Sequence, residues 1–435
     1  MITFLEETLI KIKKDYRDIS KLTIILPSKR ACGFLLNYLK SHNNKTSFAP
    51  KIISIEEFIE EVSNIKIIDS TELLFESYKV YLKTSPNQDK DSFDVYATWA
   101  NTLLNDFNEI DRYLIPTKPF FNYLSSIQDI NYWYVQDEKT ELIENYLKFW
   151  NSLSSFYETL KKTLLNKNIG YQGIVYREAS ENINHYKKTK KNTPHVFIGF
   201  NALNNAEQII IQELLENSDA KAYWDVDEYF FRKKSHSASY FLKKYFSEWN
   251  YYKTNQPKFI SNNFKTEKNF RFIEAQKNIS QVKYVGELLS KISDQELKNT
   301  AVVLADENLL NPLLQSLPNN VKKINITMGV SLKTFPISVF FSTLLSMHDT
   351  SNNRYHYKEV ISILNHPIVS KLYQDSTQLI ERITKSNLTY LSFPILLELS
   401  SLKGAEMISL LFKDWNGDSS VAINLCVKLI LQLKN

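Results

Sequence analysis

Short apolar runs alternate with stretches of helical periodicity over the first 62 residues. The run 22–26 is typical of a buried strand that stops at Pro27, and 51–55 of another short strand. Ser54 lies where it can cap the helix that follows the second run. Apolar residues at helical spacing predict one helix over 2–15, one that follows the turn after Pro27, and one over 56–62. The opening therefore predicts alternating strands and helices.

The clearest example of this pattern lies at 193–231. Residues 195–198 are β-prone and end at Gly199, residues 206–215 have helical periodicity, and residues 220–224 are a second β-prone run. We predict one β-α-β unit with parallel strands, because the helix supplies a crossover of the required length. Ligands of open α/β sheets bind beyond the carboxyl ends of the strands, so we expect a site there.

Between 69 and 191 the pattern changes to long, aromatic-rich amphipathic helices, and no strand is predicted. We interpret this stretch as an insertion into one sheet domain. Runs 22–26 and 196–198 then belong to one parallel sheet, because each part alone has too few strands to close a core.

The pattern repeats beyond residue 269. Strands are predicted at 270–275, 300–305 and 321–326, with helices at 280–292, 308–317 and 338–347; from Tyr355 onwards the chain is predicted to be helical, with a break at His366-Pro367. The predicted fold class is α/β, with two parallel-sheet domains and helical insertions. The predicted organisation is a split sheet domain at 1–68 and 193–268, a helical insertion at 69–192, a second sheet domain at 269–350 and an incomplete helical segment at 351–435.

Composition narrows the class of protein. The 435 residues are 43% hydrophobic and 23% charged, and no apolar run reaches the roughly 18 residues of a membrane span. We therefore expect a cytoplasmic protein without a membrane partner. Cys32 and Cys426 match no metal spacing and are expected to be reduced, packed thiols. The net charge of +5 leans only weakly towards an anionic partner.

The sequence lacks the residues of a nucleotide-hydrolysing site. None of the eight glycines precedes a lysine, so there is no phosphate-binding P-loop. The strand ending at Ile198 and Gly199 has an apolar tip where a magnesium carboxylate is needed. No His-Glu-x-x-His or Gly-x-Ser-x-Gly motif is present either. We expect no cofactor, no metal and no catalytic residue in this chain, and no tight binding of ATP.

Three groups of acidic residues have competing interpretations. Asp227 and Glu228, beside Asp225, follow the run 220–224 and match either a metal site or a helix N-cap. Asp306-Glu307 is explained by an N-cap. Asp137-Glu138-Lys139 nominally fits half of a nuclease motif, but lies in a polar break between helices.

Several blocks, in order along nearly the whole chain, resemble a known family. They are Leu-Pro-Ser-Lys-Arg-Ala at 26–31, Ala-Pro-Lys-Ile-Ile at 49–53, Trp99 with 103–111, 197–203, 223–229, 301–310 and Asn-Ile-Thr-Met-Gly at 325–329. Together they resemble the N-terminal, inactivated superfamily I helicase region of bacterial PD-(D/E)XK nuclease family proteins, similar to the B subunit of the AddAB helicase-nuclease. This resemblance implies helicase-like (RecA-like) domain 1A split by helical 1B, then 2A and helical 2B, with a degenerate P-loop.

The resemblance also implies site residues. Ile198 occupies the Walker B position, and its side chain cannot hold magnesium. The remaining implied residues are proposed nucleic-acid contacts: Ser28, Lys29 and Arg30 as a phosphate-binding turn, Tyr223 and Trp224 as a base-stacking pair, and Asn325 and Thr327 at a groove between domains. The competing interpretations are a solvated helix-capping turn, core packing of the aromatic pair, and a tight turn with Gly329 at positive φ.

The functional expectation is a non-catalytic, ATP-independent DNA-binding scaffold of a DNA-repair helicase-nuclease, which guides a strand to a nuclease domain beyond Asn435. Expected partners are single-stranded DNA, bound weakly and with strong salt dependence, and a helicase-nuclease partner subunit. The alternative is a protein-interaction scaffold for a partner helicase subunit, without DNA contact. We further expect this chain to cleave no DNA.

Overall fold

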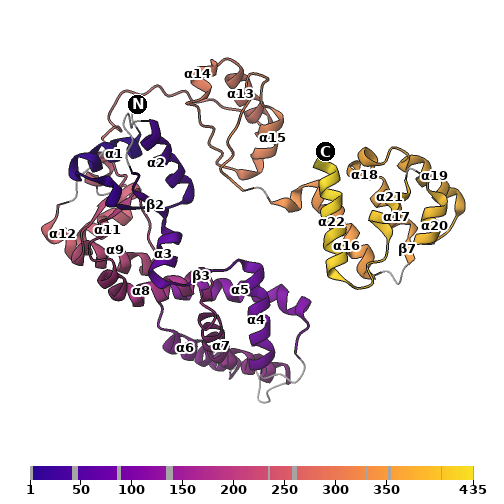
Figure 1. The fold of residues 1–435 in the computed structure, drawn as a ribbon, viewed down its shortest axis with the longest axis horizontal. Helices are drawn as coiled ribbons and strands as arrows, with labels where there is room; N and C mark the ends of the chain where they lie inside the picture. The colour runs from indigo at the N-terminus through magenta and orange to yellow at the C-terminus, as the bar shows by residue number, and fades with distance from the viewer. Residues whose placement is uncertain are drawn as a thin grey trace. The chain divides into compact units, whose positions relative to one another are not determined.

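The computed structural model describes residues 3–41, 48–85, 90–133, 141–233, 236–256, 262–329, 331–350, 354–402 and 404–434. They divide into two compact units, 1–269 and 270–435 (Figure 1). The first unit contains α1 (Phe4–Asp15), η1 (Ile19–Lys21), β1 (Thr23–Leu26), α2 (Lys29–Ser41), β2 (Lys51–Ser54), α3 (Ile55–Ser63), β3 (Lys66–Ile67), α4 (Ser70–Thr84), α5 (Phe93–Arg112), α6 (Thr117–Trp133), α7 (Glu141–Leu165), β4 (Ile169–Gly170), α8 (Gln172–Thr189), β5 (His195–Ile198), α9 (Asn205–Asn217), β6 (Ala220–Tyr223), α10 (Glu228–Arg232), η2 (Ser237–Ser239), α11 (Tyr240–Glu248) and α12 (Asn250–Thr254).

A four-stranded parallel sheet in the order β2-β1-β5-β6 organises the first unit. Ile24 of β1 is in register with Ile52 of β2 on one side and with Val196 of β5 on the other. The predicted pairing of 22–26 with 196–198 is therefore confirmed, as is the β-α-β unit β5-α9-β6.

Helices cover both faces of this sheet. Ile24 and Val196 pack with residues of α1 and α2, whereas Ile25 and Phe197 join the core formed with α3, α8 and α9. Every residue of β1 and β5 is buried, which explains why these strands read as continuous apolar runs rather than as alternating ones.

Three helices next to the sheet begin with capping boxes. The N-cap side chains are Thr3 for α1, Ser54 for α3 and Asn204 for α9, and in each the glutamate three residues later bonds back to the N-cap backbone. Ser54 is thus confirmed as an N-cap. Local sequence determines where these helices start, because the cap needs only neighbouring residues.

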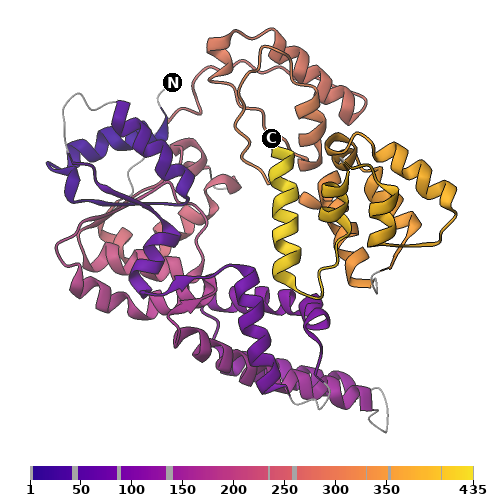
Figure 2. The same ribbon diagram turned by 45° about the vertical axis from the view of Figure 1, so that its right-hand side comes forward.

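The helices α4–α7 lie together at one end of the first unit, and α8 connects them to the sheet (Figures 1 and 2). Helix α8 contacts α5 of this group as well as α3 and α9 beside the sheet. The expectation of no strand at 69–191 was wrong at one point, since β4 pairs in parallel with β3. Each of these strands has two residues, too short for a periodicity to reveal. The division of the unit into 1A and 1B stays a prediction.

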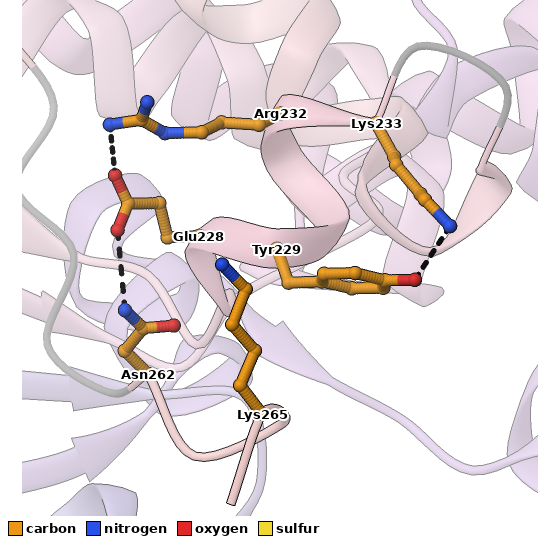
Figure 3. A pocket seen from close by; sticks show the side chains of 6 residues that line it. All are labelled: Glu228, Tyr229, Arg232, Lys233, Asn262 and Lys265. Carbon is orange, nitrogen blue, oxygen red and sulfur yellow. Dashed lines mark hydrogen bonds and ion pairs between the residues drawn. The ribbon is translucent and has the colours of Figure 1, made fainter.

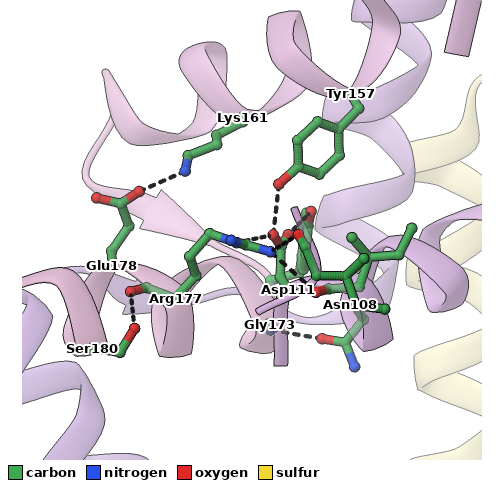
Figure 4. A network of polar contacts seen from close by, with 11 residues as sticks. Asn108, Asp111, Tyr157, Lys161, Gly173, Arg177, Glu178 and Ser180 are labelled. Atoms are coloured by element: carbon green, nitrogen blue, oxygen red, sulfur yellow. Dashed lines mark hydrogen bonds and ion pairs between the residues drawn. The ribbon is translucent and has the colours of Figure 1, made fainter. Parts of the chain in front are cut away.

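A buried polar network joins α5, α7 and α8 around Asp111 (Figure 4). The side chain of Asp111 is 0% exposed and accepts hydrogen bonds from Tyr157 Oη at 2.6 Å, Tyr171 Oη at 2.5 Å and Arg177 Nε at 2.6 Å. Arg177 also donates to the carbonyl oxygens of Ile110 and Ile115. Burial beside this carboxylate raises the pKa of Tyr171 well above its ordinary value, so its hydroxyl remains a donor.

The second unit contains α13 (Asn278–Ser290), α14 (Asp294–Leu297), η3 (Glu307–Leu309), α15 (Leu310–Gln315), η4 (Leu332–Thr334), α16 (Pro336–Thr350), β7 (Arg354–His356), α17 (Tyr357–Leu364), α18 (Pro367–Leu372), α19 (Ser376–Ser386), β8 (Tyr390–Ser392), α20 (Phe393–Leu399), α21 (Ala405–Phe412) and α22 (Ser419–Lys434). A core of residues from α16–α22 and the β7-β8 pair holds most of it together.

The strands predicted at 270–275, 300–305 and 321–326 are not formed, although the helices predicted between and after them are. Phe272 and Val303 are 93% and 89% exposed. β-Propensity reflects packing against neighbouring strands, so an apolar run stays irregular where no ladder forms beside it. The helical prediction from Tyr355 also missed the antiparallel pair β7-β8, whereas the break at His366-Pro367 is confirmed as the start of α18.

Candidate functional site

The parallel sheet has a topological switch point between β1 and β5. From β1 the chain crosses through α2 to β2 on one side, and from β5 it crosses through α9 to β6 on the other. Helices α2 and α9 belong to the cores on opposite faces of the sheet. The crossovers diverge at this point, so the carboxyl ends of β1 and β5 flank the position where ligands of open α/β sheets bind.

A crevice of ≈ 750 Å³ lies at these strand ends. Pro27 follows β1 and Gly199 follows β5, and both line the crevice. Gly199 has φ of 73°, a left-handed conformation that favours glycine, and it turns the chain away from the sheet. The remaining lining residues come from the start of α3, the end of α5, 200–208 and the start of α11; they are Ile55, Arg112, Tyr113, Phe200, Asn201, Ala202, Leu203, Asn204, Asn205, Glu207, Gln208, Tyr240, Phe241, Lys244 and Tyr245.

Exposed aromatic rings and cations share this crevice. Tyr113 is 45% exposed, Tyr240 62% and Phe241 39%. Arg112 and Lys244 add positive charge, with Arg112 Nη1 2.9 Å from a carboxylate oxygen of Glu109. Proteins that bind single-stranded nucleic acids combine exposed aromatic rings with cations in this way.

Two buried donors in the crevice have no acceptor among the described residues. They are Nε of Arg112 and Nδ2 of Asn204, a residue that is 4% exposed. Buried donors are normally hydrogen-bonded, so each of these two groups is available to donate to an acceptor oxygen of a bound molecule. The sequence did not single out these residues.

Glu207 determines what the first turn of α9 can bind. Its carboxylate accepts from the backbone N of Asn204 at 3.0 Å and so occupies the amino end of the helix. Burial raises the pKa of Glu207, which its bond to the Asn204 backbone opposes. A phosphate placed at this helix end would meet an acidic side chain, which disfavours anion binding there.

The predicted phosphate-binding turn follows Pro27 directly and is exposed. Ser28 Oγ accepts from the backbone N of Ala31 at 3.2 Å, and Lys29 Nζ lies 3.5 Å from a carboxylate oxygen of Glu57. Arg30 is also exposed. Ser28 therefore caps α2, as the competing interpretation describes, while the two cations stay accessible beside the crevice.

The structure brings neither ring of the predicted stacking pair to the surface. Tyr223 is 6% exposed, and its hydroxyl donates to Asp15 at 2.8 Å. Trp224 is 4% exposed, donates from Nε1 to Tyr252 Oη at 2.6 Å and packs against Tyr245 and Trp249. Because a base needs an accessible ring face, these positions favour the packing interpretation.

The other predicted positions are scattered. Ile198 is fully buried at the end of β5. Asn325 and Thr327 are exposed in the second unit, and Gly329 is not among the glycines with positive φ, so that part of the turn interpretation was wrong. Cys32 and Cys426 are free thiols, each partly exposed.

The acidic positions serve local structure. Asp227 caps α10, accepting from the backbone N of Tyr229 at 2.9 Å, and Asp306 caps η3. No cluster of potential metal ligands exists within the described ranges. Asp137, Glu138 and Lys139 lie outside them.

Sequence reasoning located the edge of the sheet but missed the residues around it. Tyr240, Phe241 and Lys244 lie on one face of α11, and aromatic and basic residues at this spacing are the signal that was available.

Of the part of the chain that is described, no helix has the length and apolarity to cross a membrane. A comparison with protein-family models and with curated proteins finds no match for this sequence.

Proposed function

We propose that this chain is a non-catalytic, helicase-like scaffold that holds single-stranded DNA without ATP and guides it to a nuclease in a DNA-repair helicase-nuclease. The observation that supports this proposal is the crevice at the switch point, where three exposed rings and two cations meet. Bases of any sequence stack on such rings, and the cations neutralise the phosphates between them.

The basic turn extends the same surface. Pro27 lines the crevice and Lys29 and Arg30 follow it, so a strand that leaves the crevice past the end of β1 meets two more cations. These contacts carry no base information, which fits a scaffold that holds any strand.

ATP independence is supported by both halves of the missing nucleotide site. No lysine follows a glycine anywhere in the chain, so the phosphate-binding loop is missing. At the end of β5, Ile198 offers no ligand for magnesium.

We also propose that the second unit has a state other than the one described above, in which 270–275, 300–305 and 321–326 pair into the sheet of a second RecA-like domain. The exposed apolar side chains of these runs support the pairing, because burial of apolar surface in a shared core is favourable. Phe270 is 75% exposed and Phe272 is 93% exposed. In hydrogen exchange, the amides of the three runs are expected to be protected comparably to those of α13. Exchange at the rate of an unfolded chain would overturn the second sheet.

Binding of a labelled oligothymidylate at low salt tests the DNA proposal. Tyr240→Ala is expected to raise Kd about fivefold or more, because stacking on one ring contributes about 1–3 kcal/mol. Tyr123→Ala is the matched control, since Tyr123 on α6 is 65% exposed, much like Tyr240 at 62%. Equal effects of the two substitutions would exclude the crevice as the DNA site.

Charge reversal in the same titration tests the basic turn. Lys29→Glu with Arg30→Glu is expected to weaken binding and to lower the salt slope by about 0.7 per lost phosphate contact. The control is Lys188→Glu with Lys191→Glu, which changes the net charge by the same amount. Both lysines are exposed and precede β5, so they lie towards the amino ends of the strands, away from the crevice. ATP with magnesium is expected to leave every affinity unchanged.

A protein-interaction scaffold for a partner helicase subunit is the second candidate. The exposed apolar residues of the second unit favour it, notably Phe272, Val303 and Leu332. Absence of any DNA binding by the unmodified chain at low salt would select this candidate over the first.

A further inference from the structure

Helix α2 leads away from the crevice. It begins at Lys29, two residues after Pro27, and it forms the crossover between the parallel strands β1 and β2. A crossover helix runs back along the sheet, opposite in direction to the strands that it connects. The exposed side of α2 therefore starts beside the carboxyl ends of the strands and extends away from the crevice.

One side of α2 is exposed along the whole helix. The buried side chains of α2, Leu35 and Leu39, pack in the core on one face of the sheet. The exposed residues on the other side recur three and four positions apart; they are Arg30, Gly33, Phe34, Asn37 and Lys40. Residues at this spacing are neighbours on a helix, so these five form one continuous surface, the outer face of α2.

Positive charge on α2 is not balanced within the helix. Its sequence contains Lys29, Arg30 and Lys40 but no Asp or Glu. Lys29 Nζ lies 3.5 Å from a carboxylate oxygen of Glu57 on α3, yet the Lys29 side chain is 72% exposed and remains accessible to solvent. Lys29 and Lys40 are about 17 Å apart along the helix axis, so they suit separate charges of a long anion.

The cations of α10 are arranged differently. Arg232 and Lys233 extend to opposite sides of that helix (Figure 3). Arg232 pairs with Glu228 one turn earlier, and Lys233 Nζ donates to the hydroxyl of Tyr229 at 2.6 Å. Helix α10 therefore has no single basic face, whereas an anionic chain that follows α2 meets its cations in succession.

Phe34 and Gly33 add an exposed ring and an open space to the outer face of α2. Phe34 is 46% exposed. Glycine inside a helix is destabilising relative to alanine. A Cβ added at Gly33 would have no atom of the described residues within 4 Å, so packing does not require glycine there. The missing side chain lets the backbone of another molecule approach the helix closely beside the ring.

We propose that the bound DNA strand continues from the crevice along the outer face of α2, with its sugar-phosphate backbone against Gly33. Phe34 stacks on a base, and Lys29, Arg30 and Lys40 contact successive parts of the phosphate backbone. Cations beside an exposed ring favour a nucleic acid over an acidic peptide, which has no bases to stack. This inference rests on the proposed function, because the strand reaches α2 from the crevice.

Oligothymidylates of increasing length separate α2 from the crevice. A short one fills the crevice alone, and a longer one that also reaches α2 is expected to bind the unmodified chain more tightly. Phe34→Ala is expected to raise Kd for the longer one about fivefold or more and to leave Kd for the shorter one unchanged. Phe75→Ala is the matched control, since Phe75 on α4 is 50% exposed, and it is expected to bind both as the unmodified chain does.

Gly33→Gln places a side chain where the backbone of the strand is expected to lie. It is expected to raise Kd for the longer oligonucleotide about threefold or more. It is also expected to raise the melting temperature, because glutamine has a higher helix propensity than glycine. Weaker binding by a more stable protein cannot result from misfolding.

Tyr240→Ala distinguishes failure of this path from failure of the crevice. If it weakens binding while Phe34→Ala and Gly33→Gln leave the affinity for the longer oligonucleotide unchanged, the crevice holds DNA but the path along α2 is overturned. Equal effects of Phe34→Ala and Phe75→Ala overturn the path as well. Failure of the unmodified chain to bind either oligonucleotide refutes the proposed function and the path together.

Discussion

Asp111→Ala is expected to lower the free energy of unfolding by about 3–5 kcal/mol, because it removes one partner of a buried ion pair. The carboxylate is 0% exposed, and the Arg177 side chain that faces it is only 12% exposed. Without the carboxylate, the guanidinium keeps two backbone carbonyl acceptors but loses its counter-charge, and the hydroxyls of Tyr157 and Tyr171 lose their acceptor. Urea unfolding followed by circular dichroism measures the change.

The neighbouring acid Glu109 supplies the control for this prediction. It also lies on α5 and pairs with Arg112 at 2.9 Å, but its side chain is 52% exposed. Glu109→Ala is expected to cost no more than about 1 kcal/mol, as for other surface pairs. A double substitution of Asp111→Ala with Arg177→Met is expected to cost less than the sum of its parts, since each change removes the same interaction. Equal costs for Asp111→Ala and Glu109→Ala would show that the network contributes nothing.

Gly173→Ala is expected to destabilise the chain by about 1–3 kcal/mol through overpacking. A Cβ at this position would lie 2.3 Å from the backbone oxygen of Asn108, so α8 has to move away from α5. That movement also strains the bond from the Gly173 backbone N to Asn108 Oδ1, which is 2.7 Å long. Thermal unfolding of the variant measures the loss.

Gly33→Ala makes the same chemical change with the opposite expected sign. Gly33 lies within α2 and is exposed, and no atom of another residue lies within 4 Å of the position that an added methyl group would take. Alanine there is expected to stabilise the chain by up to about 1 kcal/mol through helix propensity. If both substitutions raise the melting temperature, close packing of α5 on α8 does not limit stability.

Local sequence determined the first sheet and the helices around it. The runs of β1 and β5 are apolar without interruption because both faces of a parallel strand are covered, and the capping residues Ser54 and Asn204 need only their own next turn. Even the pairing of β1 with β5 followed from counting strands, because neither part of the chain has enough of them for a sheet alone.

Only the tertiary structure decided which residues surround the site. The crevice is lined by Pro27, Arg112, Gly199 and Tyr240, which lie far apart in the sequence. They meet because four separate segments of the chain pass the carboxyl ends of β1 and β5. The same cause explains Trp224: the family resemblance implied a base-stacking ring there, but Tyr245 and Trp249, further along the chain, pack against it.

The second unit shows the limit of local signals most clearly. Its helices were predicted from their own periodicity, since a helix bonds within itself. The apolar runs at 270–275, 300–305 and 321–326 have equally strong β signals, yet a strand forms only when another strand supplies its hydrogen bonds. The sequence therefore determined the first sheet, the helices and the caps, whereas the fate of the β-prone runs in the second unit, the buried Asp111 network and the residues that line the crevice depended on contacts between distant segments.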